Sequence, residues 1–101
     1  MNGSAYKIHP TAVAQMRDKY PHLDIVFIVN GEESTRPNET KAEALKVMHN
    51  GKEYGVTVSR LSERHYAYEV TEVGMVMDTV LGAFDTVVGA IERIGGIKNE
   101  D

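Results

Sequence analysis

Residues 54–70 read YGVTVSRLSERHYAYEV, and this stretch decides the fold class. Residues 54–59 alternate between the two faces of an extended chain, and residues 65–70 repeat the pattern with Tyr66, Tyr68 and Val70 on one face. A period of two is typical of strands that bury one face. The polar turn between the two segments predicts an antiparallel hairpin. The pair therefore predicts that the fold contains an antiparallel sheet.

Upstream of this hairpin, residues 23–29 (LDIVFIV) are apolar and β-branched on both faces after Asp24. Such a run predicts a central strand covered on both sides. Asn30-Gly31 ends it, and the polar residues up to Asn38 predict a loop. The sequence thus predicts a sheet of three or more strands.

Residues 40–49 allow two interpretations. Thr40-Lys41-Ala42-Glu43 matches a capping box, and the following residues favour a helix that Asn50-Gly51 would end. The same Asn-Gly pair between residues 45–49 and 52–54 is also typical of a type I′ hairpin. We favour the helix, and the strand of a hairpin is the alternative.

The two ends of the chain predict helices. Pro10 suits the first turn, residues 11–19 repeat apolar side chains at helical spacing, and Tyr20-Pro21 ends the pattern. At the other end, DTVLGAF (78–84) is followed by the near copy DTVVGAI (85–91). Apolar positions from Val73 to Ile94 step by four and three in turn, as in a heptad repeat, which predicts one long amphipathic helix over 73–94.

The apolar arc of this helix would cover about half of its circumference, wider than packing on one sheet requires. A soluble chain seldom leaves such a surface bare, and a second copy of the helix would cover it. The sequence therefore predicts a homodimer or higher oligomer, with an interface formed by Met77, Val80, Leu81, Phe84, Val87, Val88 and Ile91. Gly82 and Gly89 on the other face indicate either a close backbone neighbour or only a weak helix.

Together these patterns predict one small α+β domain over residues 1–101. The expected order is roughly α-β-α(or β)-β-β-α, with an antiparallel sheet, an N-terminal helix and a long C-terminal amphipathic helix. Residues 98–101 are expected to form a frayed tail. At 101 residues, with 42% hydrophobic and 26% charged side chains, the composition is that of an ordinary globular protein.

Charge and cysteine content narrow the function classes. The formal net charge is -4, and no two Lys or Arg residues are adjacent, which argues against a nucleic-acid partner. The predicted C-terminal helix has an acidic polar face, which argues against a membrane surface. The chain has no cysteine and starts without a basic and apolar leader, so we expect a cytoplasmic protein.

Catalytic signals are weak. The four histidines have no pair at i,i+3 or i,i+4, and neither a phosphate-binding glycine loop nor a nucleophile elbow is present. We expect no enzymatic activity, no metal site and no cofactor.

One polar cluster is a candidate ligand site. Arginine side chains bind phosphate or carboxylate groups in bidentate fashion, and tyrosine rings stack on bases. The residues of these types near the hairpin turn and in the polar loop are Arg36, Arg60, Arg64, His65, Tyr66 and Tyr68. The simpler interpretation, which we favour, is that the turn arginines are solvated and the tyrosines belong to the core.

The leading hypothesis is a non-enzymatic, homo-oligomeric binding protein that acts on a protein partner as an inhibitor or adaptor. The first alternative is a protein that sequesters a small anionic ligand such as a nucleotide in the Arg/Tyr cluster. The second alternative is a structural oligomerisation module.

Overall fold

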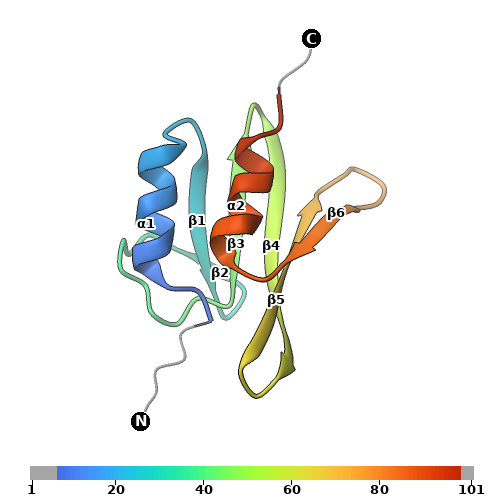
Figure 1. The fold of residues 1–101 in the computed structure, drawn as a ribbon. Helices are drawn as coiled ribbons and strands as arrows, with labels where there is room; N and C mark the ends of the chain where they lie inside the picture. The colour runs from blue at the N-terminus through green and yellow to red at the C-terminus, as the bar shows by residue number, and fades with distance from the viewer. Residues whose placement is uncertain (1–6, 99–101) are drawn as a thin grey trace.

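The computed structural model describes residues 7–98, and within them the chain forms six strands and two helices (Figure 1). In chain order these elements are α1 (Pro10–Lys19), β1 (Asp24–Val29), β2 (Glu32–Ser34), β3 (Ala44–His49), β4 (Lys52–Ser62), β5 (His65–Glu72), β6 (Thr79–Phe84) and α2 (Val87–Gly95).

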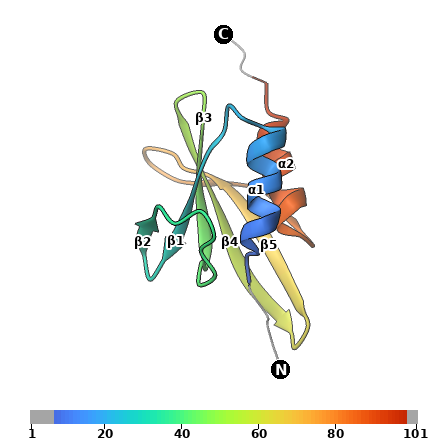
Figure 2. The same cartoon turned by 90° about the vertical axis from the view of Figure 1, so that its left-hand side faces the viewer.

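All six strands belong to one antiparallel sheet in the order β2-β1-β3-β4-β5-β6. Both helices lie side by side on one face of this sheet (Figure 2), and in the described part of the chain no element covers the other face. We call the uncovered side the open face. The α+β class, the antiparallel sheet and a helix near each end are therefore confirmed.

The core lies between the helices and the sheet because alternate residues of each strand point toward the helices. In β3 and β4, every second residue from Leu45 to His49 and from Tyr54 to Val56 is buried. The helices contribute one stripe each: Val13 and Met16 from α1, and Val87, Ala90, Ile91 and Ile94 from α2.

Two Asn-Gly turns set the topology of the sheet. Asn30 and Gly31 have φ of 53° and 80°, and Asn50 and Gly51 have φ of 55° and 79°. Two successive positive φ values are the signature of the type I′ hairpin turn. The helix favoured for residues 40–49 is therefore wrong, and the hairpin alternative is correct.

The loop predicted after Asn30 is also partly wrong, because residues 32–34 return as β2 and pair with β1. The first Asn-Gly pair carries the same hairpin signal as the second. The polar composition of residues 32–34 led us to predict a loop, because an edge strand needs no apolar side chains.

The long C-terminal helix predicted over 73–94 is wrong in its first half. Residues 79–84 form β6 and pair with β5, and α2 begins only at Val87. Gly82 has φ of 146°, which an α-helix cannot accommodate, and it lies where the β5–β6 register shifts. The near-identical segments 78–84 and 85–91 thus adopt different structures, the first mainly a strand and the second mainly a helix.

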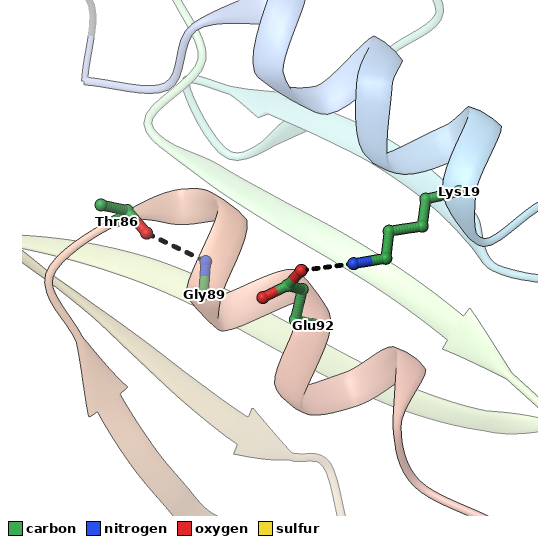
Figure 3. Close-up of polar contacts among 4 residues, drawn as sticks. All are labelled: Lys19, Thr86, Gly89 and Glu92. Carbon is green, nitrogen blue, oxygen red and sulfur yellow. Dashed lines mark hydrogen bonds and ion pairs between the residues drawn. The ribbon is translucent and has the colours of Figure 1, made fainter.

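A cap fixes where α2 begins. The Thr86 side-chain oxygen accepts a hydrogen bond from the Gly89 N–H at 3.0 Å (Figure 3). Such a cap satisfies an N–H group that has no partner within the helix. Figure 3 also shows the ion pair at 2.7 Å between Lys19 of α1 and Glu92 of α2, which joins the two helices and raises the pKa of Lys19.

The predicted oligomer interface is divided among different environments. Val87 and Ile91 are buried in the core of the chain, Leu81, Phe84 and Val88 pack partly against it, and Met77 and Val80 are exposed. The helical seam that motivated this interface is absent, and self-association stays a prediction. Of the predicted tail at 98–101, residues 99–101 lie outside the described residues.

Candidate functional site

The predicted Arg/Tyr cluster is only partly assembled. Arg60, Arg64 and His65 lie exposed at the tip of the β4–β5 hairpin, and the Arg60 Nε donates a hydrogen bond to the Ser62 carbonyl at 3.0 Å. Tyr68 is buried, and its hydroxyl donates to the Lys7 carbonyl at 2.7 Å. Burial raises the pKa of Tyr68. This tyrosine belongs to the core, and its neighbour on the same face, Tyr66, packs partly against it.

Arg36 lies elsewhere, in the loop between β2 and β3. This loop borders an open hollow of about 600 Å³ lined by Val29, Asn30, Glu32, Glu33, Ser34, Thr35, Arg36, Glu39 and Lys41. None of the hairpin-tip residues lines it, and the loop and the tip lie apart in both views (Figures 1 and 2). The structure therefore does not bring Arg36 together with the other predicted residues.

The carboxylate of Glu39, which is hydrogen-bonded within the chain, lines the hollow next to Arg36. Glu39 is buried, and it accepts hydrogen bonds from the Ser34 hydroxyl at 2.7 Å and from the Lys41 backbone N–H at 3.2 Å. These hydrogen bonds lower the pKa of Glu39. The lining contains three glutamates and two cationic residues, Arg36 and Lys41, so it offers no excess of positive charge to an anion.

A different segment stands out by its exposed apolar side chains. The loop between β5 and β6, residues Val73–Asp78, carries Met75, Val76 and Met77 with exposed fractions of 104%, 95% and 73%. We call it the apolar loop. It projects from the sheet on the side opposite the helices (Figure 2). Val80, which follows in β6, is exposed as well.

The apolar loop is held by specific contacts at its base. The Val73 N–H donates to the Glu53 carbonyl at 2.9 Å, and the Gly74 N–H donates to the Asp78 carboxylate at 3.2 Å. A Cβ atom on Gly74 would collide with the Met77 carbonyl oxygen, so the turn closes only with glycine there. The loop thus presents its side chains from a closed turn.

The open face continues this surface across the sheet. The register aligns Val26, Lys46, Gly55, Thr71 and Val80 in one row over five strands. A second row contains Asp24, Met48 and Glu53, and a third begins with Glu33, Ile28 and Ala44. Small and apolar side chains therefore form the floor of this face, and carboxylates are spread among them.

The open face carries more negative than positive charge around Lys46. The Lys46 Nζ forms an ion pair with the Glu33 carboxylate at 2.7 Å. The hydrogen bond and charge of Glu33, together with the charges of Glu53 and Asp24, raise the pKa of Lys46. One ammonium group is thus surrounded by three carboxylates.

Chain segments beside this face add further negative charge. From residue 65 to residue 92 the sequence contains five carboxylates and no Lys or Arg. Of these, Glu69 aligns with Thr57 on the open face, Glu72 aligns with the buried Tyr54 on the face that carries the helices, and Asp78 is the last residue of the apolar loop. Of these, Glu72 has a cationic neighbour, Lys52, at 3.7 Å.

Both edges of the sheet are of a kind that resists pairing with another strand. β2 has three residues and two exposed glutamates, and β6 is interrupted by the register shift at Gly82. Very short charged edges and bulged edges hinder strand addition. Neither edge is therefore suited to the addition of a further strand.

Sequence reasoning missed this surface because Met75, Val76 and Met77 were assigned to a helix. The usable signal was Gly74 followed four residues later by Asp78, a turn composition between two runs that also fit strands.

Among residues 7–98, no group of three or more His, Asp or Glu residues is placed to hold a metal ion. In the part of the chain that the structure describes, no helix has the length and apolar character needed to span a membrane. Comparisons with protein-family models, with curated proteins and with solved structures found no match to this chain.

Proposed function

We propose that this chain is a non-enzymatic binding module that docks a partner protein on the apolar loop and the adjoining open face. The observation that carries the proposal is the run Met75-Val76-Met77, whose three side chains are at least 73% exposed on a closed turn. Contiguous exposed apolar side chains on a folded chain mark interaction sites.

The composition of the loop suits protein recognition. Methionine side chains are flexible and polarizable, and they adapt to irregular apolar surfaces. The hydrogen bonds at Val73 and Gly74 fix the backbone before any partner arrives. A fixed backbone lowers the conformational entropy lost on binding.

The small-anion alternative has less support. Arg36 borders a hollow with three glutamates in its lining, and the other two arginines lie at the tip of the β4–β5 hairpin. Arginine forks bind an anion strongly only when several donors converge on it.

The proposal is tested by Val76→Asp, which places a charge at the centre of the apolar loop. Immobilised wild-type protein is exposed to an extract of the cells that express it, and the bound proteins are quantified by mass spectrometry. The matched control is Leu61→Asp, which adds the same charge at another exposed apolar residue, on the β4–β5 hairpin.

We expect one set of bound proteins to be shared by the wild type and Leu61→Asp and to be lost with Val76→Asp. Circular dichroism checks that both variants keep their fold. Equal binding by all three folded proteins would contradict the proposal.

A further inference from the structure

We propose that the open face, together with the apolar loop, accommodates a cationic amphipathic segment of the partner protein, one that presents apolar side chains to the sheet and Lys or Arg side chains to its rim. This inference rests on the proposed function and names the chemistry of the partner.

The apolar half of the recognition comes from the floor of the open face. Val26, Ile28 and Met48 are only half-buried within the chain, and Val80 continues their surface toward the apolar loop. At the centre, Gly55 has no side chain, and a Cβ atom placed there would meet no other atom within 4 Å. A partner's apolar side chain can therefore approach the backbone at Gly55.

The charged half of the recognition comes from the carboxylates around this floor. The Lys46 ammonium group pairs with Glu33 at 2.7 Å, and the register places Asp24 and Glu53 on the same face, on either side of Met48. Glu69 and Asp78 add negative charge on the side of β5 and the apolar loop. Because opposite charges attract and like charges repel, this rim selects a partner that supplies cations.

The same charges disfavour other occupants. A second copy of the chain would place one acidic face against another. Phosphate groups of nucleic acid or of an anionic membrane surface would meet carboxylates. The shape of the sheet edges disfavours an added strand. The occupant that these charges and edges allow is a helical or extended segment that lies on the open face itself.

The width of the face sets the length of the segment. Five neighbouring strands, β1 to β6 without β2, have four gaps between them. With about 4.8 Å per gap the face is roughly 19 Å wide, which a helix of about 13 residues crosses.

Three synthetic peptides of about 16 residues test the inference directly. The first carries a stripe of Leu on a Lys-rich helix, the second has the same Leu stripe with Glu in place of Lys, and the third has Ala in place of Leu. Binding to the full chain is measured by fluorescence anisotropy at about 50 mM and about 300 mM NaCl.

We expect the Leu/Lys peptide to bind at least roughly tenfold more tightly than either of the other two, and its affinity to fall by roughly tenfold at the higher salt concentration. Equal binding of the Ala/Lys peptide would overturn the inference, because attraction of charge alone would then explain the result. Equal binding of the Leu/Glu peptide would overturn it as well.

Variants locate the binding. Glu53→Lys reverses one charge on the rim, and Glu63→Lys makes the same change of net charge at the β4–β5 turn, away from the open face. We expect Glu53→Lys to weaken the Leu/Lys peptide by roughly tenfold and Glu63→Lys to weaken it by less than about twofold. Equal weakening by both variants would overturn the inference.

Two further measurements exclude other occupants. Binding to phosphatidylcholine vesicles that is lost with Val76→Asp would overturn the inference in favour of a membrane, and a dimer that is lost with the same variant would overturn it in favour of a second copy. The two proposals can fail separately. If Val76→Asp loses the native partner and Glu53→Lys leaves all binding unchanged, the binding function stands and the cationic segment is wrong.

Discussion

Gly74 decides the shape of the apolar loop, because its N–H bonds to Asp78 and its α-carbon faces the Met77 carbonyl. We expect Gly74→Ala to destabilise the protein by about 1–3 kcal/mol, since the added methyl group forces the turn open. Urea unfolding followed by circular dichroism measures this change. Gly55→Ala is the matched control: its Cβ has free space, so stability should stay the same or rise slightly. An equal loss in both variants would mean that the turn is not tightly closed.

Glu39 links the β2–β3 loop to acid stability. Its pKa in the folded chain is lowered, first by the Ser34 hydroxyl and then by the Lys41 N–H. The unfolded carboxyl takes up a proton at higher pH than the folded one, so this contribution to stability is present above the ordinary pKa of 4.5 and is lost as the pH falls through the folded value. We expect Glu39→Gln to flatten the decline of the unfolding free energy below that pH. Urea unfolding from pH 7 downward checks this, with Glu63→Gln as the exposed control.

At the scale of elements, the N-cap of α2 determines where β6 gives way to helix. We expect Thr86→Ala to lower the free energy of unfolding by about 1 kcal/mol, because the Gly89 N–H loses its acceptor. Thr86→Ser keeps the side-chain oxygen and should stay within about 0.5 kcal/mol of the wild type. Thermal and urea unfolding of both variants measure the difference. The same loss in both would show that packing of Thr86, and not its hydrogen bond, matters.

The elements also show which sequence signals were sufficient. The alternation of apolar and polar residues predicted β4 and β5, because a strand that buries one face repeats its apolar side chains every second residue. Pro10 predicted the start of α1, because proline suits the first turn of a helix. The prediction of a helix before Val87 from the apolar spacing was wrong. Steps of three and four between apolar residues also arise by chance when a loop, a strand and a helix follow one another. Gly82 was the warning sign, because this residue has a positive φ and lies where the register between β5 and β6 shifts.

For the candidate site, sequence reasoning could propose residue types but not their neighbours. Arg36 and Arg64 suit an anion chemically, yet the β2–β3 loop carries Arg36 and the β4–β5 hairpin carries Arg64, in different parts of the surface. The acidic rim around Lys46 depends on the register of β1, β2, β3 and β4, which fixes the faces of residues far apart in the chain. Only Met75, Val76 and Met77 lie close enough in sequence to have been recognised together.

At the scale of the whole molecule, the distribution of charge argues against pairing of two open faces. The heptad repeat that predicted a dimer is divided between β6, the apolar loop and the buried side of α2, so it offers no continuous seam. Two open faces would bring the carboxylates Asp24, Glu53 and Glu69 of one copy against the equally acidic face of the other, and the short β2 and bulged β6 hinder pairing at the edges. In place of the oligomer expected from the heptad repeat, we therefore expect light scattering to give 11.2 kDa for the isolated chain at physiological salt. Because screening weakens the repulsion, any self-association should increase with NaCl concentration. A stable dimer at low salt would contradict this expectation; loss of that dimer with Val76→Asp would place the contact at the apolar loop, and its persistence would place the contact elsewhere.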